Sequence, residues 1–175
     1  LKSRYKEYRA ENWQRGFGAD FDDNDQSVFE VTADERREAY EKRWAKGGLA
    51  FLAVYNDLVF DMQANDTARE FFKEKISQRI NDPALTEKLV PVTPIGCKRL
   101  CVDSEYYEIY NQDHVQLVDL NESAITQING DEIVTQDNEY SVDAIILATG
   151  FDAMTGAITN VDILGEGGHR LRDKW

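Results

Sequence analysis

The sequence predicts an α/β protein with a helical first half and a second half that holds the strands. Two capping-box patterns, Thr32 with Glu35 and Thr67 with Glu70, precede segments of helical spacing. Asn129-Gly130 lies between two short segments of strand-like composition, which predicts a hairpin. The apolar run 144–150 (AIILATG) is typical of a strand buried on both faces, as in parallel sheets.

The first predicted helix covers residues 1–15, where aromatic side chains recur at loose helical spacing and Gly16 and Gly18 follow. Residues 16–32 have no period and are rich in Asp and Asn, so we expect a mobile loop there. The pattern at Thr32 predicts that the next helix begins there, and Gly47-Gly48 should end it.

Residues 49–61 are apolar on almost all sides, which predicts a buried helix. Asp66 is a natural N-cap for a helix that runs to Asn81. Asp82-Pro83 predicts a short helix through Leu89, because proline suits the first helical position. We expect the aromatic residues of this half to form the core.

In the second half, residues 90–94 are expected to be extended, and Ser104 is expected to cap a short helix. Strands are predicted at 115–119, 124–128, 132–136 and 144–150, with a type I′ turn at Asn129-Gly130. A strand buried on both faces needs partner strands and covering helices, and the rest of the sequence supplies too few of them. We therefore expect an interior piece of a longer protein, and an independent small domain is the alternative.

The composition excludes several classes of protein. The 175 residues carry 20 Lys+Arg and 33 Asp+Glu, a formal charge of −13, which argues against a nucleic-acid partner. No apolar run approaches the roughly 18 residues that span a bilayer, and no secretory signal opens the sequence. Two cysteines do not form a disulfide framework, so a cytoplasmic setting is expected, with no membrane partner.

Lys98 and Arg99 form an isolated basic pair. No other Lys or Arg occurs between Lys88 and Arg170, within the strongly acidic second half. One interpretation is local ion pairing with nearby carboxylates (Asp103, Glu105 or Glu108). The other is a site for a phosphate or a developing oxyanion, where charge counts most in a dry cleft.

Other motifs predict little chemistry. The sequence contains neither a G-x-G-x-x-G nor a G-x-x-x-x-G-K-[ST] pattern. Cys97 and Cys101 are spaced C-x₃-C with both histidines distant, so we predict no metal site and expect buried, inert thiols. A catalytic pair of either cysteine with His114 has no local signature to support it.

Two segments carry a family resemblance. PIGCKRLCVDSEYYEIYNQDHVQLVDL (94–120) resembles the part of Baeyer–Villiger monooxygenases that holds their active-site arginine, and DAIILATGFDAMTGA (143–157) resembles their late ATGFD motif. The residues that follow fit the same family, and residues 1–93 resemble its helical insertion less distinctively. The likeness covers essentially the whole chain and is strongest to cyclohexanone-monooxygenase-type members.

The resemblance implies a fold and an activity. Residues 1–93 would form a helical subdomain, 94–150 the C-terminal part of a Rossmann-like NADP-binding domain, and 151–175 the start of the return to the FAD domain. Such enzymes bind FAD and reduce it with NADPH. A flavin C4a-peroxide formed from O₂ then attacks a ketone, and the adduct rearranges to an ester or lactone.

The resemblance also implies residue roles. Arg99 matches the catalytic arginine, and Cys97 and Lys98 match positions beside bound NADP. Thr149 and Gly150 match the end of the strand that faces the nucleotide crevice, and Asp152 is expected to have no catalytic role. The family's glycine-rich FAD and NADP fingerprints are missing, so the chain alone is expected to be inactive without the remainder of its polypeptide.

Two alternatives stay open. One is a flavin monooxygenase that oxygenates nitrogen or sulfur, since an ATG motif followed by an aromatic residue is shared among flavin monooxygenases. The other is a non-catalytic interaction module whose helices bind a partner.

Overall fold

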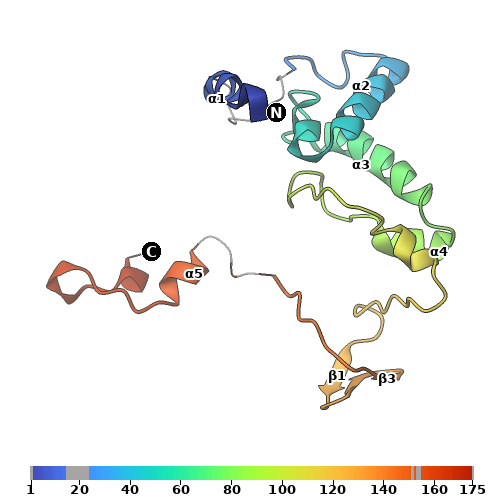
Figure 1. Cartoon of the computed structure of the whole chain (residues 1–175), viewed down its shortest axis with the longest axis vertical. Coiled ribbons are helices and arrows are strands. Elements are labelled where there is room, and N and C mark those ends of the chain that lie inside the picture. The colour runs from blue at the N-terminus through green and yellow to red at the C-terminus, as the bar shows by residue number, and fades with distance from the viewer. Residues whose placement is uncertain (1, 15–23, 151, 153–154, 175) are drawn as a thin grey trace. The chain divides into compact units, whose positions relative to one another are not determined.

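A computed structural model describes residues 2–14, 24–150, 152 and 155–174. The chain divides into two compact units, residues 1–119 and 120–175. The first is helical and the second holds the strands, as predicted (Figure 1). The first unit contains the elements η1 (Lys2–Arg4), α1 (Tyr5–Trp13), α2 (Ala33–Lys46), η2 (Gly48–Ala53), α3 (Met62–Ser77), α4 (Pro83–Leu89) and η3 (Glu108–Asn111), where η is a 3₁₀ helix.

Helices α1 and α2 confirm the first predictions. Helix α1 buries none of its residues, and the glycines expected to end it lie outside the described residues. Helix α2 begins at the predicted capping box: Thr32 Oγ1 accepts a hydrogen bond from the Glu35 N–H, and the Glu35 carboxylate accepts one from the Thr32 N–H. Gly47 ends α2 with φ +78°, a conformation that glycine adopts at little cost. Residues 24–32 are a loop, as expected.

The core lies between α2, η2 and α3, which are neighbours in Figure 1. The Tyr40 ring centroid lies 5.3 Å from those of Phe51 and Phe71, and the Trp44 centroid lies 5.0 Å from that of Phe72. Such tilted and edge-on aromatic pairs combine large apolar burial with favourable quadrupole contacts. On the outside, Arg37 binds both carboxylate oxygens of Glu74 and so joins the two helices. The predicted aromatic core is confirmed.

The α-helix predicted over 49–61 is wrong. Residues 48–53 form the 3₁₀ helix η2, and turns follow. Besides the bonds of these turns, the backbone here bonds to the preceding loop: the Asn56 N–H donates to the Gln26 carbonyl, and the Val54 carbonyl accepts from the Asn24 amide. Burial was only partly predicted, because Leu58 is fully buried whereas Phe60 is 89% exposed.

Helix α3 begins earlier than predicted. Its N-cap is Asp61, whose carboxylate accepts a bond from the Ala64 N–H, so Asp66 lies inside the helix and pairs with Arg69. The helix ends at Ser77 rather than Asn81. Helix α4 confirms its prediction, with Asp82 as N-cap and Pro83 at the first position.

Two predictions between residues 104 and 119 are wrong. Ser104 does not cap a helix, because Glu105 directly after it adopts a non-helical φ of +63°. The short 3₁₀ helix η3 begins only at Glu108. Residues 115–119 form no strand.

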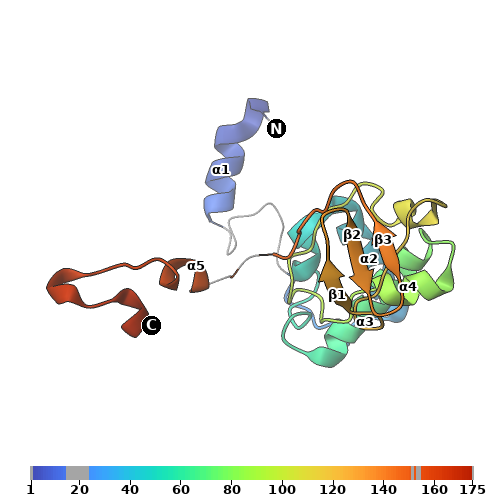
Figure 2. The same cartoon turned by 90° about the horizontal axis from the view of Figure 1, so that it is seen from below.

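The second unit contains an antiparallel sheet in the order β1 (Ile125–Ile128), β2 (Glu132–Thr135) and β3 (Glu139–Ser141), seen side by side in Figure 2. The predicted hairpin is confirmed, with Ile128 opposite Ile133. Its turn is not type I′, because neither Asn129 nor Gly130 has a positive φ. The strand β3 was not predicted.

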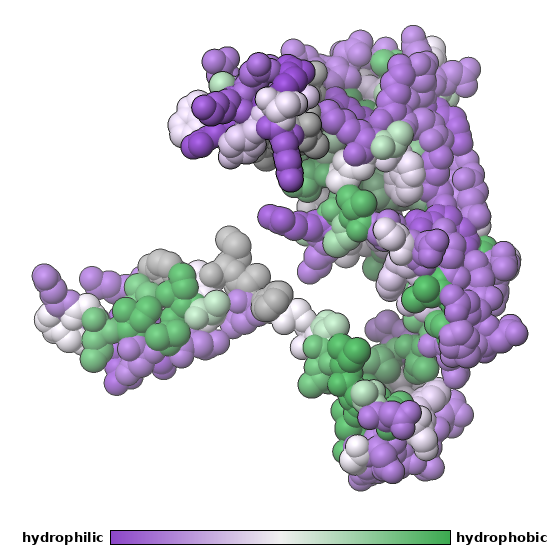
Figure 3. Space-filling view, viewed as in Figure 1, coloured by the Kyte–Doolittle hydropathy of each residue, from purple (hydrophilic) through white to green (hydrophobic). Residues whose placement is uncertain are grey.

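The buried strand predicted over 144–150 is wrong in this chain. These residues pair with no strand among the described ones, and Ile146 is 90% exposed. Hydrophobic side chains accordingly gather on the surface between β3 and α5 and around α5 itself (Figure 3). The rest of this unit is α5 (Gly156–Thr159), η4 (Glu166–Gly168) and η5 (Leu171–Asp173). Within the described residues, no helix has the length and apolar character needed to cross a membrane.

Candidate functional site

The basic pair Lys98–Arg99 lies on a loop, residues 94–103, that is fixed to α3 at its beginning. The Asn65 side chain on α3 accepts a hydrogen bond from the Ile95 N–H at 2.8 Å and donates one to the Ile95 carbonyl at 2.9 Å. Both residues are buried. The Cys97 N–H donates to the Pro94 carbonyl at 3.1 Å, which closes a turn directly before the basic pair.

Gly96 is required at its position in this turn. Its φ is +97°, and a Cβ atom there would lie 3.2 Å from Val59 Cγ1 and 3.3 Å from Leu52 Cδ2. Only glycine fits both the backbone conformation and this close approach without strain. The loop is therefore pressed against the η2 region immediately before Lys98.

Lys98 and Arg99 are both exposed, and within the described part of the chain neither forms an ion pair. The local pairing considered for them is therefore not seen. Asp103 and Glu108, two of the carboxylates that could have bound the pair, are both bound by Arg79 instead. The positive charges at the turn are therefore exposed.

Arg79 follows the end of α3 and holds the far end of the loop. Its guanidinium contacts the Glu108 carboxylate at 2.5 and 2.6 Å and the Asp103 carboxylate at 2.8 and 3.1 Å. It also lies 5.2 Å from the centre of the Tyr107 ring. Hydrogen bonds from Arg79 lower the pKa of Glu108 and that of Asp103, and the same bonds raise the pKa of Arg79. All three groups are charged at neutral pH.

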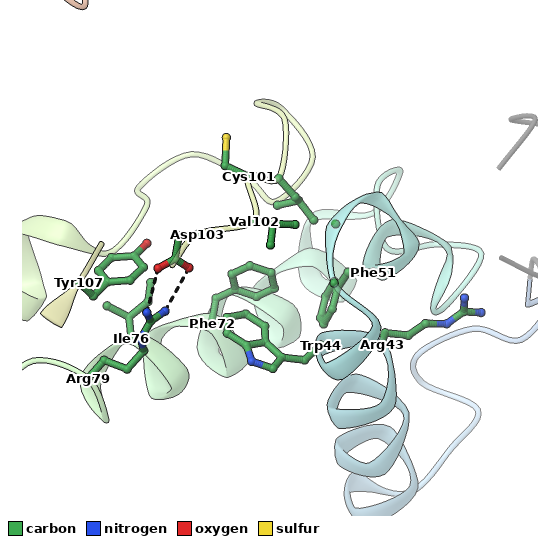
Figure 4. A pocket seen from close by; sticks show the side chains of 13 residues that line it. Arg43, Trp44, Phe51, Phe72, Ile76, Arg79, Cys101, Val102, Asp103 and Tyr107 are labelled. Atoms are coloured by element: carbon green, nitrogen blue, oxygen red, sulfur yellow. Dashed lines mark hydrogen bonds and ion pairs between the residues drawn. The ribbon is translucent and has the colours of Figure 1, made fainter. Parts of the chain in front are cut away.

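Residues of the loop line two cavities. One of about 260 Å³ is shown in Figure 4, where Trp44, Phe51 and Phe72 form an aromatic wall and the Arg79–Asp103 pair lies at one end. A second of about 210 Å³ is lined by Lys98 and Arg99 together with Pro91, Pro94, Phe72 and Tyr107. The basic pair thus borders a partly apolar hollow within the first unit.

The two cysteines are exposed free thiols, so the expectation that they are buried is wrong. Cys97 belongs to the turn, where its N–H is used internally. Across the described residues, no group of three or more His, Cys, Asp or Glu side chains is placed to hold a metal.

Thr149 and Gly150 belong to the second unit and are exposed. Gly150 has φ +85°, which explains a glycine at this point, and a Cβ there would meet nothing within 4 Å. Phe151 lies outside the described residues. Asp152 packs against Gly156 at the beginning of α5, where a Cβ on Gly156 would overlap its carboxylate at 2.0 Å, and accepts a bond from the Asn160 amide. Asp152 therefore has a structural contact.

Similar proteins exist among curated sequences, although no protein-family model matches the chain. A cyclopentanone 1,2-monooxygenase of a Comamonas species is 42% identical over 162 residues, which are 90% of this chain and 30% of that protein. A Baeyer-Villiger monooxygenase of Pseudooceanicola batsensis and a phenazine N-monooxygenase of Lysobacter antibioticus are each 34% identical over 158 residues, 89% of this chain and 29% of those proteins.

Solved structures of monooxygenases are also similar to this chain. An oxidized steroid monooxygenase bound to NADP matches 99% of this chain and 34% of its own, with a TM-score of 0.91 and 44% identity. OTEMO in complex with FAD and NADP matches 100% of this chain and 33% of its own, with a TM-score of 0.92 and 34% identity. This chain is thus homologous, over most of its length, to a segment of Baeyer–Villiger monooxygenases. It spans about 30% of the length of the curated relatives that it matches.

The sequence indicated the basic pair but not the two residues that hold its loop. Asn65 lies just before the helix predicted from Asp66 to Asn81 and Arg79 lies near its end, 34 and 20 residues before Arg99, with no motif that marks them. The only sequence signal for Arg79 was indirect. Asp103 and Glu108 lie near Lys98 and Arg99, and these two cations cannot bind every carboxylate around them, so another cation was needed. Nothing in the sequence marked Asn65.

Proposed function

We propose that these residues are an interior segment of an FAD-dependent, NADPH-using monooxygenase. The whole enzyme would insert one oxygen atom of O₂ beside the carbonyl of a ketone and release an ester or lactone. The observation that carries the proposal is the exposed Lys98–Arg99 pair beside a cavity, which forms no ion pair with the residues that the structure describes, in a chain 42% identical to a cyclopentanone 1,2-monooxygenase. The remainder of the polypeptide would supply the rest of the active site.

The proposed domains refer to the whole enzyme. Residues 1–93 form a helical subdomain, 94–150 complete a Rossmann-like NADP-binding domain, and 151–175 begin the return to the FAD domain. The exposed apolar run at 144–150 supports this division, because a segment with Ile146 90% exposed needs partner strands that lie elsewhere in the polypeptide.

The charge of the basic pair fits a nucleotide with phosphate groups. Lys98 and Arg99 present two positive charges whose neighbouring carboxylates are already bound by Arg79. We assign Lys98 and Cys97 to the NADP site, with Thr149 and Gly150 at the nucleotide crevice. NADPH and FAD supply the reducing equivalents and the oxygen-activating chemistry when bound; the described residues form no glycine-rich FAD site of their own.

We assign the catalytic role to Arg99. Addition to a ketone carbonyl places negative charge on oxygen, and a fixed cation lowers the free energy of that charge, most strongly where water is excluded. A guanidinium stays protonated in such a site, whereas an ammonium can lose its proton. Its planar donors can also bind two oxygens at once.

The chain by itself is expected to be inactive, because it carries no G-x-G-x-x-G fingerprint for either nucleotide. Ketone-dependent ester formation by the isolated 175 residues would contradict this. The intact mass of the natural gene product is a direct check. We expect a mass several-fold above 20.1 kDa, and a product near that mass would leave the chain without an FAD site.

A second candidate function is oxygenation of nitrogen. It is favoured by one observation, the 34% identity to a phenazine N-monooxygenase. The experiment that separates the two candidates assays the complete enzyme with NADPH against cyclic ketones, aromatic amines and sulfides. Ester or lactone products support the first candidate, and N-oxides alone would replace it with the second.

A further inference from the structure

We propose that Asn65 is a positioning residue for Arg99 and acts through the backbone of Ile95. The inference rests on the proposed function, because it concerns the same arginine. It adds a residue of the helical part to the machinery of oxygen transfer.

The contact between Asn65 and Ile95 is specific. The Asn65 side chain is 3% exposed and uses both ends of its amide on one residue: Oδ1 accepts from the Ile95 N–H, and Nδ2 donates to the Ile95 carbonyl. Nδ2 also donates to the Leu58 carbonyl at 2.9 Å. The side chain therefore takes the place of a neighbouring strand and fixes both peptide groups of Ile95.

No other side chain of this size can make these bonds. An amide offers an acceptor and a donor on one planar group, whereas an ionised aspartate offers only acceptors and leucine offers neither. Aspartate at this position would face two carbonyl oxygens, those of Ile95 and Leu58, without a donor. Leucine would leave the buried N–H of Ile95 unpaired.

The hydrogen bonds that fix Ile95 also restrict the backbone of Arg99, because the segment between the two residues is short and well packed. Only three residues separate Ile95 from Arg99, and the bond from the Cys97 N–H to the Pro94 carbonyl closes a turn there. Gly96 is pressed on Leu52 and Val59, and Leu100 packs against the core immediately after Arg99. The backbone of Arg99 is thus fixed from both sides, while its side chain is exposed.

Such fixation matters because catalytic cations act by being in place before charge develops. A displacement of about 1 Å can cost about 100-fold in rate. Loss of the Asn65 amide releases the backbone four residues before Arg99, so the guanidinium should lose its fixed position without being removed.

The test uses the complete enzyme with Asn65→Asp and Asn65→Leu. Asn24→Asp and Asn24→Leu are matched controls, because the Asn24 amide likewise donates to a backbone carbonyl, that of Val54, and accepts from a backbone N–H, that of Gln26. We expect the Asn65 variants to lower the ester formed per NADPH consumed at least tenfold, with the balance appearing as hydrogen peroxide. The KM for the ketone should change less than threefold.

Hydrogen exchange supplies a readout independent of turnover. Amides of residues 95–99 should exchange at least tenfold faster in the Asn65 variants, and the Asn24 variants should leave them unchanged. If the variants of both positions alter coupling and exchange equally, the effect is general loosening and the positioning role is overturned.

If the Asn65 variants fail to fold, Gly96→Ala tests the positioning of Arg99 in their place. It disturbs the same turn from the opposite side and leaves the Asn65 amide in place. We expect the same loss of coupling, and coupling within twofold of the parent enzyme would overturn the proposal. Arg99→Ala, measured in parallel, distinguishes failure of the proposed function from failure of the positioning role. If Arg99→Ala still forms ester, the proposed function fails. If Arg99→Ala forms none while Asn65→Asp and Gly96→Ala still form ester, only the positioning role fails.

Discussion

The Arg79 guanidinium donates hydrogen bonds to both carboxylate oxygens of Asp103, at 2.8 and 3.1 Å. It also binds Glu108, so one arginine after α3 binds two carboxylates around the loop of Lys98 and Arg99. This arrangement holds the far end of the loop. It also engages these two carboxylates away from the basic pair, whose charge we propose serves an anionic ligand or intermediate.

Replacing Arg79 should therefore destabilise the first unit. Arg79→Met keeps most of the side-chain stem but leaves Asp103 without its partly buried partner. We expect a loss of about 2 kcal/mol in the free energy of unfolding at pH 7, between the values typical of exposed and buried pairs. Urea denaturation measures it. Lys42→Met is the control, because the Lys42–Glu38 pair is highly exposed, and its variant should change stability by less than about 0.5 kcal/mol.

The effect of Arg79 should depend on pH in a defined direction. Hydrogen bonds from Arg79 lower the pKa of Glu108 and of Asp103 in the folded state. A lowered folded pKa contributes stability above the ordinary carboxyl value of about 4, and this contribution disappears as pH falls through the folded value. The gap between the parent chain and Arg79→Met should therefore narrow below about pH 3. An equal gap at pH 7 and pH 2.5 would show that packing, not charge, carries the effect.

The capping box at the start of α2 predicts a local effect. Thr32→Ala removes the acceptor for the Glu35 N–H and should cost about 1 kcal/mol in the free energy of unfolding. Glu35→Ala should add little in a Thr32→Ala background, since the two side chains bond reciprocally. Thermal or urea unfolding of the four chains measures this coupling. If the losses of Thr32→Ala and Glu35→Ala simply added in the double variant, the two side chains would not act together as a capping box.

The aromatic core gives the largest expected loss. Phe71 is 5% exposed, and its ring lies within 6 Å, centre to centre, of those of Tyr40, Trp44 and Phe51. Phe71→Ala should cost about 4 kcal/mol, because it leaves a cavity among rings that cannot fully relax. Phe60→Ala is the matched control: Phe60 is 89% exposed, and its loss should cost less than about 0.5 kcal/mol. Similar losses at both positions would place the core elsewhere.

Local chemistry made several elements predictable from the sequence. Thr32 with Glu35, Gly47 and Asp82-Pro83 each form contacts within a few residues of themselves, so the helix boundaries that they set could be inferred correctly. Prediction failed where distant residues decided the outcome. The segment 49–61 has the composition of a buried helix, but its backbone bonds to Asn24 and Gln26, some 30 residues earlier.

The site follows the same rule. Lys98 and Arg99 stood out by their charge contrast with the residues around them, whereas the roles of Asn65 and Arg79 depend on contacts across 24 to 30 residues. The strand expected at 144–150 failed for a related reason. Its composition indicates burial on both faces, and the described residues provide no strand to pair with it.

The measurement that tests the central claim most directly is the ester formed per NADPH consumed by the complete enzyme carrying Arg99→Ala, beside Arg99→Lys. We predict that Arg99→Ala abolishes ester formation while NADPH-driven flavin reduction largely survives, and that Arg99→Lys retains a small part of the activity. Ester formation by Arg99→Ala at the rate of the parent enzyme would contradict the account.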